Sequence, residues 1–442
     1  MKVKKERVSR KASREQLESL KLCAELSRVI KRYFPELIQK LKTITDSRHA
    51  GYIRYRNHVL LMTRILSAIF YISSMRKTSE EFNSEKVIRN IGCLCGEDLD
   101  EVPCWETINL YLKTVPPEEL QAIVNDLVNG LLRSRVFEDA RIRGKYWQVI
   151  LDGTQLASSC RELDGECLHR VHNRGKENEY TEHYYYVLEA KIYLHKDIYV
   201  SIMTEFVENS ETEVQKQDCE MKAAKRLMER LKKRFPMLPI CISADSLYAC
   251  EGLFETCEKY RWAYIIRYKK GSIPSIYEEY QSLREQEGNY REYQTEDLKC
   301  WYDHVNQIDY RGHLLNILEY EDSNRKKFCF LTNLTITEKN RKDLLKDGRR
   351  RWAIENQGFN TQKKQGYALE HLFSRNYQAI KNHYFLIQIG HMISQILESW
   401  ETLWKNIRQS REQKHRRMLE SWKNDLLEDC CSDNKRYQIR LL

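Results

Sequence analysis

The spacing of apolar residues changes along the chain and predicts helical regions on either side of a central sheet. Between residues 15 and 75, apolar side chains recur every three or four positions, which is typical of helices. The same spacing predicts a helix, a turn and a second helix over 105–112 and 118–132. Beyond His371 it returns as an apolar stripe over 384–396. We therefore expect helices at both ends of the chain.

Between these regions, continuous apolar runs are typical of buried strands. In chain order we expect three strands, a helix, a strand, a helix and a strand, at 146–152, 184–193, 198–206, 213–235, 238–244, 249–259 and 261–268. Consecutive strands favour an antiparallel meander, and strands joined through helices favour parallel additions. This order predicts an α/β fold with a ribonuclease-H-like mixed sheet, in which the first and fourth strands are neighbours.

The scheme is interrupted after residue 270 by a polar stretch, and strand-like runs resume at 314–320 and 327–332. We interpret this part as a β-rich insertion. For the first region, a DNA-binding domain and an ordinary helical bundle both stay open. The predicted division is a helical, DNA-binding region at 1–143, the first part of a catalytic domain at 144–270, the insertion at 271–335, a catalytic helix at 336–374 and a helical, basic region at 375–442.

Charge and composition narrow the class of partner. The 442 residues carry a formal net charge of +10, with basic clusters at 2–14 and 408–417, which favours a polyanion such as DNA. Solvated helix faces are the alternative for either cluster. The sequence shows neither a secretory signal nor the roughly 20 apolar residues of a membrane span. Its 14 cysteines are scattered, which favours reduced thiols in a cytoplasmic protein.

Three acidic residues occupy informative places in this pattern. Asp152 closes the strand-like run that begins at 146, and Asp245 closes the run at 238–244. Glu355 lies in a basic stretch that is typical of the opening of a helix. Two carboxylates at strand ends and one on a nearby helix can hold two divalent metal ions about 3.5–4 Å apart, the arrangement used to attack phosphodiesters. If the three converge, the chain is a polynucleotidyl transferase.

Each acid also has a simpler structural interpretation. Asp152 and the glycine after it could form a turn, and Asp245 could cap the next helix. Arg351 and Glu355 are four residues apart and could form an exposed ion pair. The order strand, strand, terminal helix within one sheet scheme nevertheless favours a shared site.

The helix of Glu355 adds candidate DNA contacts. Arg351 lies one turn before the acid, and Gln362 lies about two turns after it, followed by Lys363 and Lys364. Such a face can bind metal at its centre and grip phosphates on either side. Its apolar residues, seven apart, could equally form a core-facing side, and both interpretations can hold together.

A cluster of cysteines and histidines follows the first strand. Cys160, Cys167, His169 and His172 could bind zinc, but their spacing is not a standard structural pattern. The alternative is a loop near the active site whose His172 and Arg174 meet DNA. Both alternatives stay open at this point.

The chain resembles the DDE transposases of bacterial insertion sequences, in particular the branch with a β-strand insertion and a Tyr-x2-Arg-x3-Glu-x6-Lys signature. The resemblance covers roughly residues 100–400. Its motifs are Leu151-Asp152-Gly153-Thr154, Ala244-Asp245-Ser246-Leu247-Tyr248-Ala249, Arg351-Trp352-Ala353-Ile354-Glu355-Asn356 and Lys216-Gln217-Asp218-Cys219-Glu220. Gly348 stands where the family has Tyr, and Gln362 stands where it has Lys.

The resemblance implies that Asp152, Asp245 and Glu355 coordinate two Mg²⁺ or Mn²⁺ ions for strand cleavage and strand transfer. It implies double-stranded DNA, both element ends and target, as the partner of a homodimer or higher oligomer in the bacterial cytoplasm, at the nucleoid. Two alternatives stay open. One is a ribonuclease-H-like nuclease or resolvase that cleaves without joining, and the other is a catalytically silent DNA-binding protein.

Overall fold

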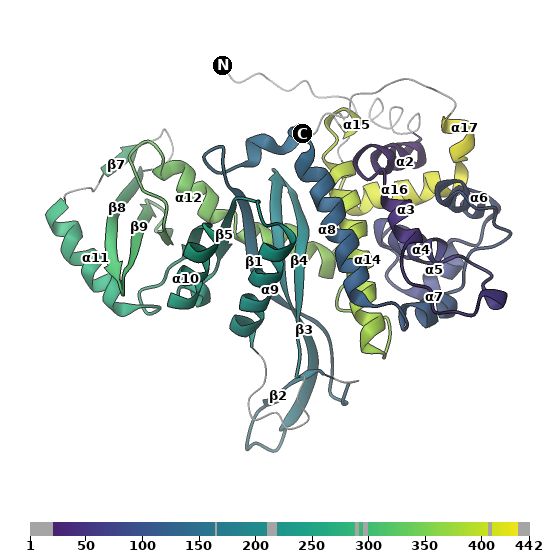
Figure 1. Cartoon of the computed structure of the whole chain (residues 1–442), viewed down its shortest axis with the longest axis horizontal. Coiled ribbons are helices and arrows are strands. Elements are labelled where there is room, and N and C mark those ends of the chain that lie inside the picture. Colours follow the sequence, from purple (N-terminus) through teal and green to yellow (C-terminus); the bar gives the residue numbers. More distant parts are fainter. Residues whose placement is uncertain are drawn as a thin grey trace.

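The computed structural model describes residues 21–163, 166–209, 219–287, 291–294, 299–404 and 409–431. A mixed sheet occupies the centre, with helices from both ends of the chain on one side and a sheet extension on the other (Figure 1). This architecture confirms the predicted fold class. The basic segment 2–14 lies outside the described residues, and within them no helix has the length and apolar character needed to cross a membrane.

The central sheet follows the predicted ribonuclease-H-like order. Its strands are β1 (Trp147–Ser159), β2 (Leu168–His172), β3 (Tyr180–His195), β4 (Ile198–Val207), β5 (Ile240–Ala244) and β6 (Ala263–Arg267). β1 pairs antiparallel with β3, and β3 pairs antiparallel with β4. On its other edge β1 pairs parallel with β5, which pairs parallel with β6. The first and fourth predicted strands are therefore neighbours, as the apolar runs indicated.

Helices join the parallel strands and cover the sheet. They are α9 (Glu220–Arg234), before β5, and α10 (Glu251–Tyr260), before β6. The Ala and Leu positions of α9 are buried while its basic residues stay at the surface, as expected for an amphipathic helix that packs on a sheet. Each crossover thus returns the chain to the same edge, so the ends of β1 and β5 face the same way.

The predicted β-rich insertion continues the central sheet. It comprises α11 (Pro274–Glu287), β7 (Arg291–Gln294), β8 (Lys299–Tyr310), β9 (His313–Asp322) and β10 (Lys327–Thr332). β10 pairs antiparallel with β6, and β9, β8 and β7 follow outward. Apolar runs had predicted β9 and β10, whereas α11, β7 and β8 were not predicted. The division of the chain into domains remains a prediction.

Helices from the two ends of the chain pack together beside β4. The N-terminal ones are α2 (Leu22–Tyr33), α3 (Leu37–Lys42), α4 (Asn57–Ile69), α5 (Met75–Glu81), α6 (Glu85–Cys95), α7 (Trp105–Leu112) and α8 (Pro117–Arg133). The C-terminal ones are α14 (Tyr377–Glu398), α15 (Glu401–Trp404), α16 (Arg411–Asn424) and α17 (Leu427–Cys431). The expected pair of helices around the two prolines corresponds to α7 and α8.

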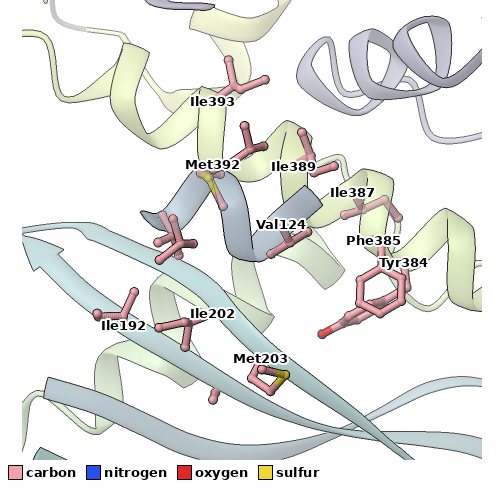
Figure 2. Close-up of a cluster of buried hydrophobic side chains, with 14 of the residues drawn as sticks. Val124, Ile192, Ile202, Met203, Tyr384, Phe385, Ile387, Ile389, Met392 and Ile393 are labelled. Carbon is pink, nitrogen blue, oxygen red and sulfur yellow. The ribbon is translucent and has the colours of Figure 1, made fainter. Parts of the chain in front are cut away.

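Helix α14 joins the helical part to the sheet. It is buried along almost its whole length and contacts α4, α8 and β4. Figure 2 shows Phe385, Ile389 and Met392 of α14 in a cluster with Val124 of α8 and Ile202 of β4. Burying side chains of this size stabilises the fold by roughly 1.5–3 kcal/mol each. This core holds the sheet, and with it β1, which contains Asp152, and β5, which leads into Asp245.

Candidate active site

Asp152 lies within β1, and Asp245 directly follows β5, the parallel neighbour of β1. The expectation that Asp152 ends its strand or forms a turn is wrong, because β1 continues to Ser159 and Asp152 pairs with Glu189 of β3. The pairing of β1 with β5 ends at Ile150 and Ser243, two residues before each acid. The residues before both acids are buried, so the two acids follow buried segments at the same level of the sheet.

Asp245 also caps the turn that follows it. Its Oδ1 accepts the backbone N–H of Leu247 at 2.8 Å, at the start of the 3₁₀ turn Ser246–Tyr248. The capping interpretation is therefore confirmed. The cap fixes one carboxylate oxygen of Asp245 at the start of this turn.

Glu355 approaches the strand acids from an irregular helix. Instead of the ordinary helix that the sequence predicted, α12 (Arg341–Arg349) is followed by a π-helical segment, Ile354–Phe359, and then by α13 (Asn360–Lys364). The prediction was wrong on this point because the apolar period does not distinguish α from π geometry over six residues. Short π-helical segments occur frequently at functional sites.

Arg351 joins the strand and helix parts of the site. Its guanidinium Nη1 lies 2.9 Å from Glu355 Oε1 and 3.5 Å from Asp152 Oδ2. The Arg351 side chain is only 11% exposed, so the contact with Glu355 is not the exposed ion pair that spacing alone would suggest. The structure thus brings Arg351, Glu355 and Asp152 together.

Negative charge accumulates around Asp152. The pKa of its carboxyl is raised to about 7, chiefly by burial and also by the nearby Glu355 and Glu220, against the opposing effect of Arg351. A carboxyl that is hard to ionise among other carboxylates is a site where added positive charge is favourable. Carboxylate oxygens are the ligands that Mg²⁺ and Mn²⁺ prefer, and Arg351 already supplies a cation between two of them. Asp152, Asp245 and Glu355 therefore fit divalent metal ions.

A fourth acid at the site was missed by the functional interpretation of the sequence. Glu220, the first residue of α9, accepts hydrogen bonds from the hydroxyls of Tyr186 and Tyr248, both at 2.7 Å. The motif that ends in Glu220 is part of the family resemblance, which assigns it no role. A signal was present, since an acid shortly before the strand of Asp245 opens a helix that packs on the same sheet.

The two departures from the family signature have packing explanations. A Cβ on Gly348 would lie 2.7 Å from the Phe330 ring, so no larger side chain fits there without a shift. Gln362 is fully buried, and its Nε2 lies 2.8 Å from Gln388 Oε1 and 2.9 Å from His391 Nδ1. The expected face that ends in Gln362 is therefore wrong at this residue, which belongs to the contact with α14.

The predicted DNA contacts differ in their surroundings. Lys363 pairs with Glu370 at 2.9 Å, and Lys364 is exposed. His172 does not lie in a loop as expected, because it ends β2, where it lies 2.8 Å from Glu182. Arg174 follows in the exposed turn toward β3. The hairpin of β2 and β3 projects from the sheet (Figure 1), so the predicted DNA contacts of His172 and Arg174 lie away from its centre.

The zinc interpretation has no support in the part of the chain that is described. Cys160 is exposed, and the Cys167 thiol lies 3.8 Å from His183 Nδ1. Among described residues, the one group of three potential metal ligands with all donor atoms within 4.8 Å consists of Glu251, Glu255 and His313. The three predicted catalytic acids do not form such a compact group.

Several residues of the basic cluster at 408–417 form ion pairs and packing contacts within the protein. His415 is fully buried, with Nε2 2.7 Å from Glu398 Oε1, and its ring stacks on Tyr71 at 3.7 Å. Arg411 also pairs with Glu398, at 3.0 Å. Arg416 pairs with Glu412 within α16. This cluster fastens α16 to α4 and α14.

Comparison with known proteins gives one family. The model of the family described as "Transposase DDE domain" matches residues 163–393, slightly more than half of the chain. The match includes Asp245 and Glu355 and begins after Asp152. No curated protein matches the sequence.

Among solved structures, the cryo-EM structure of a piggyBac transposase synaptic complex with hairpin DNA aligns with 94% of this chain and 82% of that one. The identity is 13% and the TM-score is 0.43, a likeness too distant to carry an argument about the site. On the strength of the match over 163–393, the chain belongs to the family of transposase DDE domains.

Proposed function

We propose that this transposase cleaves DNA strands and transfers them to target DNA with two Mg²⁺ or Mn²⁺ ions held by Asp152, Asp245 and Glu355. The observation that carries the proposal is the convergence at one sheet edge. The β1–β5 pairing ends two residues before Asp152 and two before Asp245, which supports a shared site, and Arg351 contacts both Asp152 and Glu355.

The residues of the site divide the work. Asp152 and Asp245 are fixed by their strands and would define one side of the metal site, while Glu355 would close it from the π-helical segment. When bound, the ions activate a water or a DNA 3′-hydroxyl and stabilise the leaving oxygen of an in-line displacement. Arg351 would turn from the acids toward a DNA phosphate, because its guanidinium can bind either partner in the same geometry.

DNA would reach this edge along exposed basic residues. Lys364 is the last residue of α13 and Arg174 lies in the projecting hairpin, so both can contact the phosphate backbone without fixing its sequence. The substrate proposed is double-stranded DNA, both element ends and target, bound by a homodimer or higher oligomer. A bacterial insertion sequence as the source fits this proposal.

A strand-joining assay tests the proposal. An oligonucleotide with the DNA end that flanks the gene would be incubated with a plasmid and Mg²⁺, and joined and cleaved products would be separated. We expect joined products for the natural protein and none for Asp152→Asn, with DNA binding kept. Asp139→Asn, at an exposed acid outside the site, is the matched control. Cleavage without joining would indicate a nuclease, and binding alone would indicate a silent DNA-binding protein.

A further inference from the structure

Glu220 lies in the middle of a small hydrogen-bonded group next to the acids. Its Oε2 accepts the Tyr186 hydroxyl and its Oε1 accepts the Tyr248 hydroxyl, each at 2.7 Å. Both oxygens of one carboxylate are thus engaged by side chains from different elements, β3 and the turn after β5. An acid in the first turn of a helix is favourable on its own, but that role requires no tyrosines.

Tyr186 connects Glu220 to the strand of Asp152. A Cβ on Gly153 would lie 2.1 Å from the Tyr186 hydroxyl oxygen, so this ring packs directly against the backbone after Asp152. Gly153 is required here because any side chain would displace the tyrosine. The hydrogen bond to Glu220 therefore holds the Tyr186 ring against the backbone that directly follows Asp152.

Tyr248 connects the same carboxylate to Asp245. It ends the 3₁₀ turn that Asp245 caps, and it is almost fully buried. Its hydrogen bond to Glu220 ties this turn to the start of α9. A displacement of Tyr248 would move the backbone N–H of Leu247, which is the group that holds the Asp245 carboxylate.

We propose that Glu220, through Tyr186 and Tyr248, is a positioning residue that sets the relative placement of the Asp152 and Asp245 carboxylates for divalent metal. This inference rests on the proposed function. Groups that orient metal ligands through hydrogen bonds commonly matter almost as much as the ligands, and their loss costs roughly 10- to 100-fold in metal affinity or activity. The two hydrogen bonds are charge-assisted, which makes them about twice as strong as neutral ones.

Four variants separate the hydrogen bonds of Glu220 from its charge. Glu220→Ala removes both, and Glu220→Gln keeps a group that can bond to both hydroxyls without charge. The double variant Tyr186→Phe with Tyr248→Phe keeps the charge and removes the bonds. Tyr377→Phe is the matched control, because the Tyr377 hydroxyl donates to a different acid, Glu208, at 2.9 Å, while its ring also packs on β3, against Tyr185.

Three properties would be measured on the full chain. They are Mn²⁺ affinity by calorimetry without DNA, the Mg²⁺ concentration for half-maximal strand cleavage, and amide hydrogen exchange at Leu247 and Tyr248 in metal-free protein. We expect Glu220→Ala and the double variant to weaken Mn²⁺ binding by roughly 10- to 100-fold and to speed exchange at both amides. Glu220→Gln should lose less than Glu220→Ala, and Tyr377→Phe should match the natural protein.

Two results would overturn the inference. The first is Mn²⁺ binding and exchange in Glu220→Ala equal to those of Tyr377→Phe. The second is a loss in Glu220→Gln as large as that in Glu220→Ala, since charge and not positioning would then matter. Melting temperatures show whether each variant folds, and the milder single variant Tyr248→Phe replaces any that does not. Absence of cleavage in the natural protein would instead contradict the proposed function.

Discussion

The sheet and the π-helical segment present their acids in different ways. Asp152 and Asp245 follow buried residues of a paired sheet, so their positions are fixed by hydrogen-bonded register. Glu355 lies on an irregular helix, its side chain is 45% exposed, and it forms an ion pair with Arg351. The difference indicates that the sheet supplies a fixed half of the site and the helix an adjustable half.

Changing the length of an acid tests this difference with the largest expected effect. We expect Asp245→Glu to abolish metal-dependent cleavage, because a capped strand end cannot shift to accommodate an extra methylene. Glu355→Asp should keep measurable cleavage, because a half-exposed residue on a π-helical segment can move toward the strands. Both would be compared in the strand-joining assay with matched DNA binding. Equal loss in the two variants would contradict the distinction between a fixed and an adjustable half.

The pH dependence of stability tests the fixed half. The pKa of Asp152 in the folded protein, about 7, exceeds the value of about 3.9 for an unfolded chain. The folded state therefore binds more protons between these values, and this group lowers the free energy of unfolding as pH rises from 4 to 7. In the natural protein, this group should lower the free energy of unfolding by as much as roughly 4 kcal/mol between pH 4 and 7. We expect this decrease to be absent from Asp152→Asn, as measured by urea unfolding at each pH.

Asp347 provides an internal reference for that measurement. Burial raises its pKa to about 6, so it contributes a similar pH dependence in both proteins and cancels in the difference. Asp139→Asn is the control for loss of an acid as such. If the free energy of unfolding changes with pH in the same way in the natural protein and in Asp152→Asn, the folded protein does not disfavour the ionised form of Asp152.

A smaller effect is expected where α12 packs on β10, just before the adjustable half. Gly348→Ala places a methyl group against the Phe330 ring, and we expect it to destabilise the protein by about 1–3 kcal/mol, as overpacking of a core does. Thermal unfolding measures the change. Combination with Phe330→Leu should recover part of the loss. A stable Gly348→Tyr variant would contradict the packing explanation for this departure from the family signature.

The smallest expected effect concerns the projecting hairpin. Arg174→Ala should weaken DNA binding about equally for all sequences and lower the slope of log affinity against log salt by about one, as expected for one lost phosphate contact. Cleavage per bound complex should not change. Fluorescence anisotropy at several salt concentrations measures the slope. Lys176→Ala serves for comparison, because Lys176 is another exposed basic residue of the same turn. An unchanged slope for both would place DNA elsewhere.

The sequence was most informative where burial alone decides structure. Apolar runs identified β1, β5 and β6, and with them the neighbouring placement of Asp152 and Asp245. β2, β8 and α11 were not predicted, because they are amphipathic or polar and gain their stability from neighbours that are distant in sequence. Local pattern therefore predicted the centre of the sheet better than its extensions.

The π-helical segment and the contacts around it could not be predicted from apolar runs. A π-helical segment differs from an α-helix in one residue per turn, and no residue type marks it over so short a span. The burial of Gln362 against Gln388 and His391 depends on α14, which is distant in the chain. The role of Glu220 depends on two tyrosines from separate elements. Such contacts follow from tertiary packing and are not encoded in local spacing.

The most direct test of the central claim is the anomalous diffraction of Mn²⁺ in crystals of the protein. The account predicts two peaks about 3.5–4 Å apart between Asp152, Asp245 and Glu355, with Arg351 moved off the acids. Mn²⁺ bound only elsewhere, for example at Glu251, Glu255 and His313, would contradict it.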